Sequence, residues 1–393
     1  MSRPLMFVQT GDLHLGSPFA FAGDKAPWLV RAQLDAFVAI IQLCQQVQVD
    51  CLLIAGDLFD QPVPDRALVR TVQELLGSLE QTQVLIAPGN HDPAAFDSPY
   101  RCEAWPANVR IFLDTLEKVE WPEAGVRVFG CGFTSTVAPI PLPLVPPDGL
   151  DPDWFNLCLV HGDLVGAGSS PYNPISAASL AEMGYDYVAL GHVHAFSGFL
   201  KERQTTYAYA GCPFGRGFDE TGTKGVIIGT LQTQQGLGHK MALDLRFSPI
   251  GGRRFLAQSV NLAGCQDHRQ AADAILIALQ TAAGNTWPDH VYKITLTGDL
   301  APDFRLSLAV LEPLLHGQLF WYRLVDETRQ PVDLNELARE HSLRGAFVRQ
   351  AQLDLQQAAD QGQQQDLLIL TRALELGLAA LRGEEVGYET DPA

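Results

Sequence analysis

The hydrophobic pattern of the first 230 residues alternates between short apolar runs and longer segments with helical spacing. Apolar runs at residues 4–10, 49–56 and 83–89 predict strands, and residues 28–47 and 64–81 repeat apolar side chains at the spacing of helices. Five more apolar runs predict further strands, at residues 126–133, 155–162, 185–192, 206–211 and 224–231. Strands that first alternate with helices and then follow one another predict a layered α/β domain with two packed sheets.

A second pattern begins after Gly251-Gly252, which we interpret as a hinge. Residues 255–327 predict a small strand–helix–strand–helix–strand domain, and the chain is predicted to be helical from about Asn335. The Gln-rich residues 356–365 predict an exposed connection before a final amphipathic helix. The proline-dense residues 137–153 predict a surface loop. We therefore expect a large α/β domain at 1–245, a small α/β domain at 253–330 and a helical region at 331–393.

Composition limits the class of protein. A chain of 393 residues with 47% hydrophobic residues is long enough for two or three folded domains. We find no run of 18 apolar residues and no signal-peptide pattern, so we expect a cytoplasmic protein. Its seven cysteines are scattered and form no CxxC pair, which argues against a disulfide framework or a thiolate zinc site. The net charge of -18 argues against independent tight binding to nucleic acid.

Five polar clusters follow predicted strands directly. In α/β sheets, ligands bind at the carboxyl ends of the strands. Taken alone, each cluster is typical of a turn, but so many turns with Asp, His or Asn at strand ends indicate a shared ligand. The clusters are GDLH (Asp12, His14), GDLFD (Asp57, Asp60), GNHD (Asn90, His91, Asp92), HGD (His161, Asp163) and GHVH (His192, His194).

The donor types in these clusters indicate a metal centre. Oxygen and imidazole donors without thiolate suit Mn²⁺, Fe or Zn²⁺. His192 and His194 are two residues apart, so in an extended segment both imidazoles point to the same side. About seven ligands exceed one tetrahedral site and suit two ions that share a carboxylate. Two such ions can hold a phosphate and activate water for phosphoester displacement.

In their order and spacing, the five clusters resemble the calcineurin-like metallophosphoesterase superfamily. The resemblance implies a four-layer fold of two packed mixed β-sheets flanked by helices. It also implies that Asp57 bridges two ions, most simply Mn²⁺, with Fe or Zn²⁺ as alternatives. The first ion would be held by Asp12, His14 and His194, and the second by Asn90, His161 and His192.

The same resemblance gives His91 a different role. It would face the scissile phosphate and donate a proton to the leaving oxygen or stabilise the charge there, and Asp92 would orient it. We expect Asp60 and Asp163 to be turn residues or to support the ligating histidines rather than to bind metal directly.

Within the superfamily, GDLHLGSPF, LLIAGDLFD, IAPGNHDP and VALGHVHAF are most similar to the Mre11/SbcD nuclease branch, particularly its bacterial YhaO-like DNA repair exonuclease group. The later segment YAGCPFGRGFDETGTKGVII is similar too, and Arg216 and Lys224 in it are candidate phosphate contacts. Alternatively, Arg216 packs a loop or pairs with Asp219 or Glu220.

The branch also implies partners. In relatives the small α/β domain caps the active site, and the terminal helices grip a coiled-coil SMC-like ATPase. Residues 367–381 could dock in this way or could pack on their own domain. We expect DNA and such an ATPase as partners, with a homodimer possible and no membrane. The ATPase would then supply most of the DNA-binding surface that this acidic chain lacks.

Three functions fit these observations. The first is a metal-dependent phosphodiesterase, a DNA exonuclease or endonuclease subunit in repair. The second is a phosphomonoesterase or cyclic-nucleotide phosphodiesterase that uses the same dinuclear site. The third is a scaffold subunit of a DNA-tethering ATPase complex. A scaffold has no need of His91, and a minimal small-molecule phosphatase has no need of the large C-terminal region, so we favour the nuclease.

Overall fold

The computed structural model describes residues 4–146, 148–165, 169–234, 239–330 and 333–381. The chain divides into two compact units. Unit 1 comprises Met1–Gln258, Asn285–Ile294 and Gly317–Arg323, and unit 2 comprises Ser259–Gly284, Thr295–His316 and Leu324–Ala393. The five polar clusters all lie in unit 1.

The elements follow one another along the chain as α/β segments and then as a series of strands and helices. The strands are β1 (Leu5–Thr10), β2 (Cys51–Ile54), β3 (Gln83–Ile86), β4 (Val109–Ile111), β5 (Glu117–Trp121), β6 (Val126–Cys131), β7 (Phe155–His161), β8 (Tyr187–Gly191), β9 (Leu200–Glu202), β10 (Thr205–Tyr209), β11 (Gly225–Thr233), β12 (Lys240–Pro249), β13 (Phe255–Asn261), β14 (Val291–Thr297) and β15 (Trp321–Asp326). The helices are η1 (Ala20–Lys25), α1 (Ala26–Val47), α2 (Arg66–Gly77), α3 (Pro99–Cys102), η2 (Pro122–Ala124), α4 (Ala177–Met183), α5 (His268–Ala283), η3 (Gly284–Asp289), α6 (Leu308–Leu315), α7 (Leu334–Arg339), α8 (Leu343–Asp360) and α9 (Gln364–Leu381).

Unit 1 contains two mixed six-stranded sheets. Sheet 1 has the order β12-β11-β1-β2-β3-β4, with β1 to β4 parallel and β11 and β12 antiparallel. Sheet 2 has the order β5-β6-β7-β8-β10-β9, with β6, β7, β8 and β10 parallel. The parallel strands of each sheet end at one edge, and the five clusters lie there.

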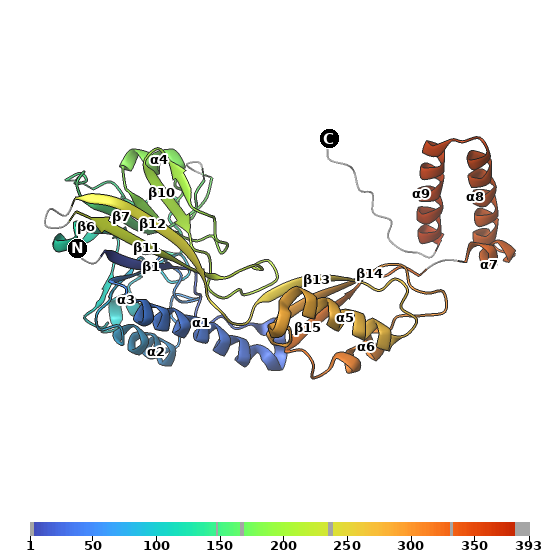
Figure 1. Ribbon diagram of the computed structural model, residues 1–393, viewed down its shortest axis with the longest axis horizontal. Helices are drawn as coiled ribbons and strands as arrows, with labels where there is room; N and C mark the ends of the chain where they lie inside the picture. The colour runs from blue at the N-terminus through green and yellow to red at the C-terminus, as the bar shows by residue number, and fades with distance from the viewer. Residues whose placement is uncertain (1–3, 147, 166–168, 235–238, 331–332, 382–393) are drawn as a thin grey trace. The chain divides into compact units, whose positions relative to one another are not determined.

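The core confirms the predicted layering. Phe7, Leu53 and Leu159 belong to a buried cluster between the two sheets. On the other face of sheet 1, Val8 and Leu52 pack against apolar side chains of α1 and α2, and on the other face of sheet 2 a third cluster includes Leu180 of α4. Figure 1 shows α1 and α2 on one side of the sheets and α4 on the other. The fold is therefore the expected four-layer arrangement of two mixed sheets flanked by helices.

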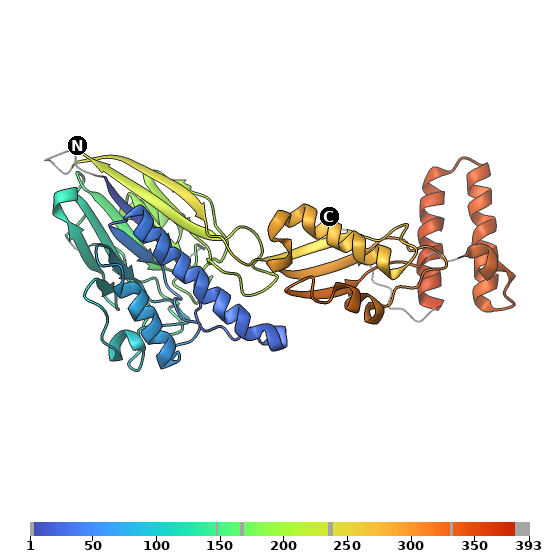
Figure 2. The same cartoon turned by 60° about the horizontal axis from the view of Figure 1, so that its bottom comes forward.

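Helix α1 is the most apolar helix of unit 1. The segment Ala20–Val47 is long and apolar enough to cross a membrane by length and composition alone, and 39% of its most apolar window is buried in the structure. Phe37, Ile40 and Ile41 of this helix belong to the core cluster on sheet 1. Figure 2 shows the blue helix lying along the strands of that sheet, which explains its apolar face by packing.

Short elements and the Gln-rich stretch differ from the sequence predictions. Strands β4, β5 and β9 and helices α3 and α4 were not predicted, because each has seven residues or fewer and too few periodic apolar positions. The predicted connection at 356–365 is mostly helical, since α8 ends at Asp360 and α9 begins at Gln364. Gln and Ala both favour helices, so low sequence complexity did not signal a loop here.

Unit 2 contains part of a third sheet and the C-terminal helices. Strands β13, β14 and β15 form a three-stranded sheet in that order, and the division between the units passes through these strands. Helices α8 and α9 form an antiparallel pair (Figure 1), in which Val348, Leu374 and Leu378 are buried together.

Gln9 ties the two sheets of unit 1 together. It lies on β1 and is fully buried on the face towards sheet 2. Its Nε2 donates to the carbonyl oxygens of Leu190 (3.2 Å) and Ala208 (2.9 Å), on β8 and β10. The Tyr187 hydroxyl donates to the Gln9 Oε1. A buried amide with three partners fixes the position of one sheet against the other, because each partner is costly to leave unpaired.

Replacing Gln9 with Leu should therefore destabilise unit 1. We expect the free energy of unfolding to fall by about 1 to 3 kcal/mol, since the buried Tyr187 hydroxyl loses its acceptor. Tyr187→Phe should cost less in the Gln9→Leu background than in the natural sequence, because both polar partners are then absent. Urea unfolding of the natural protein, the two single variants and the double variant measures these free energies. An equal cost of Tyr187→Phe in both backgrounds would contradict the interaction between Gln9 and Tyr187.

Candidate metal centre

The carboxyl ends of strands from both sheets converge at one site. Asp12 and His14 follow β1 of sheet 1, while His161 ends β7 of sheet 2. The backbone N–H of Asp12 donates to the carbonyl of Gly56, and that of His14 to the carbonyl of Asp57, at 3.0 and 2.8 Å. The loops after β1 and β2 are thus bonded to each other, which places their side chains together.

Several ligand candidates have an unusual backbone conformation. Within the described segments, eight non-glycine residues have a positive φ. Four of them are predicted ligands: Asp12 (51°), His14 (47°), Asp57 (49°) and His192 (115°). This conformation costs on the order of 1 kcal/mol for a residue with a Cβ atom. It allows the chain to turn sharply at the strand end and to aim consecutive polar side chains at one point.

The three residues predicted for the first metal lie together. Asp12, His14 and His194 each offer a ligand atom within 4.8 Å of the others. The Nε2 atoms of His14 and His194 are 3.2 Å apart. Glu220 Oε1 lies 2.6 Å from the Nδ1 of His194, so a proton on Nδ1 leaves the lone pair of Nε2 facing inward. Burial raises the pKa of Glu220, but its contacts with His194 and Arg216 outweigh this effect and lower it to about 2.

Asp57 lies between the two predicted metal positions. Its Oδ2 is 3.5 Å from His14 Nε2 and 3.6 Å from His161 Nε2. Its Oδ1 accepts from the backbone N–H of His91 at 2.9 Å. Burial raises the pKa of Asp57, but the neighbouring His161 and His14 outweigh burial and lower it. Gly89 leaves this carboxylate its space, because a Cβ there would lie 2.2 Å from Asp57 Oδ1.

His161 and Asn90 form the core of the second predicted position. The Nδ1 of His161 lies 2.9 Å from the carbonyl oxygen of Ala55, which fixes the proton on Nδ1. Its Nε2 is 3.0 Å from Asn90 Oδ1. Asp12, Asp57 and His161 also offer ligand atoms within 4.8 Å of one another. An amide oxygen, an imidazole nitrogen and a shared carboxylate therefore face one point.

His192 is the predicted ligand whose side chain is least closely grouped with the others. Its backbone N–H donates to both carboxylate oxygens of Asp12, at 2.9 and 3.1 Å. Its ring centroid lies 5.3 Å from that of His161 and 5.2 Å from that of Tyr172. None of the groups of close ligand atoms found among the described residues includes His192. The other six predicted ligands are brought together, and His192 lies beside them.

His91 lies against the centre with Nδ1 held by a carbonyl oxygen. Its Nδ1 is 3.1 Å from the carbonyl oxygen of Asp60. Its ring meets that of His14 edge-on, with centroids 4.6 Å apart. A proton on Nδ1 is held by the carbonyl, so Nε2 is the atom available for proton exchange.

Asp92 is buried beneath the site and contacts backbone rather than the His91 ring. Its carboxylate accepts from the backbone N–H groups of Asp57 (3.1 Å), Phe59 (3.0 Å) and Gly89 (2.9 Å). The Tyr100 hydroxyl donates to it at 2.6 Å. Burial and the nearby Asp57 carboxylate raise the pKa of Asp92 to about 7. The residue thus joins the loops that carry Asp57 and Asn90, while His91 is oriented by a carbonyl.

Arg216 pairs with carboxylates that support the ligating histidines. Its Nη1 is 3.1 Å from Asp60 Oδ1 and its Nη2 is 3.2 Å from Glu220 Oε1. Asp60 Oδ1 is also 3.3 Å from His14 Nδ1. Of the alternatives for Arg216, pairing with Glu220 is present in the structure, and one quarter of its side chain stays exposed.

Lys224 and Asp163 occupy supporting positions. The Lys224 ammonium donates to the carbonyl of His194 at 3.1 Å and lies 3.2 Å from Cys212 Sγ, and the residue is 6% exposed. This places it under the His194 loop rather than on a surface open to phosphate. The backbone of Asp163 pairs with that of Tyr172 and Ile175 in a later segment of the chain.

Sequence reasoning did not identify three groups that hold the site. They are the carboxylate of Glu220 and the carbonyl of Ala55, which orient His194 and His161, and the hydroxyl of Tyr100 on Asp92. A carbonyl leaves no sequence signal, and Tyr100 lies on a four-residue helix. Glu220 was considered only as a partner of Arg216, although it lies in the segment YAGCPFGRGFDETGTKGVII that resembled the nuclease branch.

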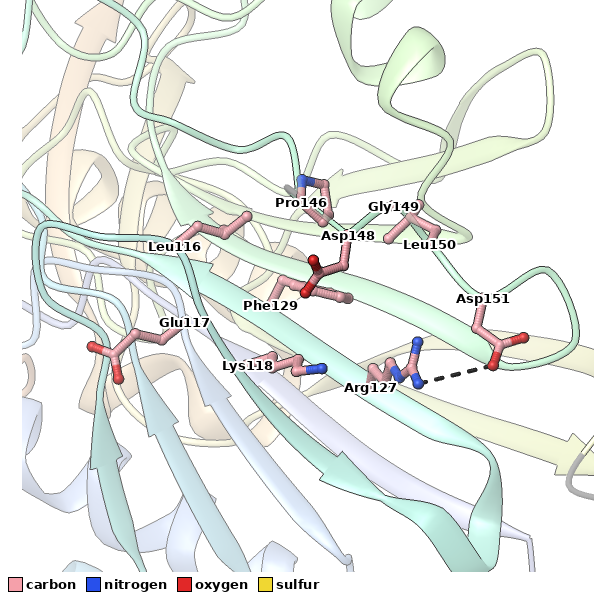
Figure 3. A pocket seen from close by; sticks show the side chains of 10 residues that line it. All are labelled: Leu116, Glu117, Lys118, Arg127, Phe129, Pro146, Asp148, Gly149, Leu150 and Asp151. Carbon is pink, nitrogen blue, oxygen red and sulfur yellow. Dashed lines mark ion pairs between the residues drawn. The ribbon is translucent and has the colours of Figure 1, made fainter.

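A separate cavity of about 480 Å³ opens beside β5 and β6 (Figure 3). Charges of both signs line it, and Arg127 pairs with Asp151 at 3.8 Å and with Glu120 at 2.8 Å. None of the residues of the five polar clusters lines this cavity. Its cations are neutralised by neighbouring carboxylates, so we assign the chemistry to the strand-end site.

The residues of the strand-end site fit a pair of divalent ions. Two imidazole nitrogens, His14 Nε2 and His194 Nε2, face each other, and Asp57 Oδ2 faces both predicted positions. Oxygen and imidazole donors of this kind suit Mn²⁺, Fe or Zn²⁺. Buried carboxylates are costly without nearby positive charge, which a bound cation supplies.

The family comparison agrees with this geometry. The model of the calcineurin-like phosphoesterase family matches residues 5–196, the region that contains all five clusters. Over 254 residues the chain is 29% identical to the uncharacterized metallophosphoesterase YhaO of Bacillus subtilis strain 168, in a match that covers 58% of each chain. Residues 5–196 are therefore similar to the calcineurin-like phosphoesterase family.

Similar solved structures include two chains of low identity. The protein TT1561 of Thermus thermophilus aligns over 63% of this chain and all of its own, with a TM-score of 0.36 and 11% identity. Vacuolar protein sorting 29 from Cryptosporidium parvum aligns over 63% and 98%, with a TM-score of 0.31 and 14% identity.

Glu220 should contribute to metal affinity without binding the ion. Glu220→Gln weakens the hold on His194 Nδ1, and we expect metal affinity to fall by about 10- to 100-fold. Competition with a fluorescent chelator measures this, with Glu182→Gln, at an exposed position, as the control. An unchanged affinity in Glu220→Gln would contradict the role of this carboxylate.

Proposed function

We propose that the chain is a metal-dependent phosphodiesterase that cleaves DNA in repair, a nuclease of the Mre11/SbcD kind that uses Mn²⁺ in the cytoplasm. One observation carries the proposal: Asp57 faces both His14 and His161, while His91 adjoins the centre and is held through Nδ1. This is the division of labour that phosphodiester hydrolysis needs, with charge neutralisation in one place and a proton donor in another.

The side chains of this protein would share the work as follows. When bound, the two ions would neutralise the phosphate and make water nucleophilic at neutral pH. The ions would be held by Asp12, His14, Asp57, Asn90, His161 and His194. His192 would complete the second position. His91 would donate a proton from Nε2 to the leaving oxygen, since histidine exchanges protons near neutral pH. Asp92 would act as a positioning residue through the backbone of Asp57 and Gly89.

The preference for a nuclease rests on two further features. The quoted strand-end segments are most similar to the Mre11/SbcD branch, and one relative is a metallophosphoesterase with 29% identity. The chain also carries unit 2, which hydrolysis of a small phosphomonoester does not require. The match spans 58% of the length of that relative, so the activity of the whole chain remains our proposal.

His91→Ala should separate catalysis from metal binding. We expect Mn²⁺-dependent cleavage of end-labelled single- and double-stranded DNA to slow by about 10²- to 10⁴-fold, because the general acid is lost. Metal content, measured by mass spectrometry, should stay unchanged, and a chelator should abolish cleavage by the natural protein. His316→Ala, at an exposed histidine of unit 2, is the matched control.

Other substrates in the same assay test the competing functions. Activity on a phosphomonoester or a cyclic nucleotide alone would contradict the nuclease. Absence of activity on every substrate would favour a scaffold subunit.

A coiled-coil ATPase is the partner that we propose. Helix α9 buries Leu374 and Leu378 against α8, while Leu368 and Ile369 are 75% and 59% exposed. The helix therefore packs on its own hairpin through one face and offers apolar side chains on another, as a docking helix does. The partner would supply most of the DNA-binding surface that a chain of net charge -18 lacks.

The purified chain should therefore bind duplex DNA weakly by itself. At physiological salt we expect a dissociation constant above about 1 µM, within the range of non-specific binding. Fluorescence anisotropy with a labelled duplex measures it. Tight binding by the chain alone would contradict the division of roles between this chain and an ATPase.

A further inference from the structure

An open hollow of about 440 Å³ adjoins the candidate metal centre within unit 1. Three of the side chains that line it, Asp60, Arg216 and Glu220, contact the candidate ligands His14 and His194. The hollow thus begins directly beside the predicted position of the first ion. Its lining is completed by Ser17, Pro18, Phe19, Ala20, Phe21 and Asp219.

One wall of this hollow is aromatic. Phe21 is 47% exposed, although its ring contacts Trp321 and Phe255, with centroids 5.3 and 6.0 Å apart. The interplanar angles are 84° and 63°, so neither ring is stacked parallel on Phe21. Phe19 beside it is 4% exposed and packs on Phe214. A half-exposed phenyl group that contacts a buried ring (Phe255) and a partly buried ring (Trp321) offers a surface for stacking.

The charges of the hollow disfavour a second phosphate group. Three carboxylates, Asp60, Asp219 and Glu220, line it with one guanidinium. Arg216 already donates its Nε, Nη1 and Nη2 to Asp60 and Glu220. The excess of carboxylates repels phosphate oxygens but accepts hydrogen bonds from amino groups. An uncharged planar group with N–H donors suits both the aromatic wall and the carboxylates, and a nucleobase is such a group.

We propose that this hollow is a nucleobase subsite, in which the base next to the scissile phosphate stacks on Phe21. This inference rests on the proposed function, because the phosphate of the same nucleotide would be held at the metal centre. It makes Phe21 a residue that determines specificity for nucleotides over simple phosphoesters. Stacking on one aromatic side chain is sequence-tolerant, since every base has a π-face.

Binding measurements on the full chain loaded with Mn²⁺ test the subsite. In calorimetric titrations we expect deoxyadenosine 5′-monophosphate to bind at least 10-fold more tightly than methyl phosphate. Phe21→Leu should reduce this advantage by about 5- to 100-fold, the range for stacking of one base. Phe21→Tyr should preserve it, because the ring is kept. Phe199→Leu is the control, since Phe199 is 39% exposed and lies outside the hollow.

The outcomes distinguish the subsite from the proposed function. An equal advantage of the nucleotide in the natural protein and Phe21→Leu would overturn the subsite, as would the lack of any advantage. A loss in Phe21→Leu with retention in Phe21→Tyr supports it. Failure of the natural protein to cleave DNA, with the nucleotide advantage intact, would overturn the nuclease function and leave the subsite standing.

Discussion

The candidate centre depends on the alignment of two sheets. Asp12, His14, Asp57 and Asn90 come from the ends of sheet 1, and His161, His192 and His194 come from the ends of sheet 2. A shift of one sheet would separate the two halves of the ligand set. Hydrogen bonds across the interface oppose such a shift, from the Gln9 amide to Leu190 and Ala208 and from His161 Nδ1 to Ala55. Polar contacts in an otherwise apolar interface thus fix the relative positions of the candidate ligands on the two sheets.

A shell of carboxylates surrounds the imidazoles. Asp57 contacts His14 and His161, Glu220 contacts His194, and Asp60 lies beside His14. These contacts orient the rings, but they also gather negative charge in a buried place, where Arg216 compensates only part of it. Bound cations would complete this balance. The site is thus acidic, like the chain as a whole. This local excess of carboxylates favours the binding of metal ions over direct contact with a polyanion.

The sequence predicted that the five polar clusters lie at strand ends, because strand ends leave clear patterns. An apolar run followed by Gly and then Asp or His marks both the edge of a sheet and the donor. The alternation of apolar and helical segments predicted a layered α/β domain with two packed sheets, and the family resemblance implied the four layers. The partners of the ligands were harder to predict, since Ala55 acts through its carbonyl and Tyr100 lies on a helix of four residues. Lys224 illustrates the converse: its charge indicated a phosphate contact, but its burial depends on tertiary packing.

The candidate ligands with a positive φ at the strand ends serve the metal centre at a cost in stability. At Asp12, His14 and Asp57 a glycine would suit the backbone better, because it accepts a positive φ without steric cost. Selection for stability alone would therefore drive these positions towards residues that have no donor atoms. The chain keeps carboxylate and imidazole there, and rigid packing of two sheets must compensate. A screen for thermal stability alone would therefore not protect these positions, and a stabilised variant of this protein must also be tested for metal binding.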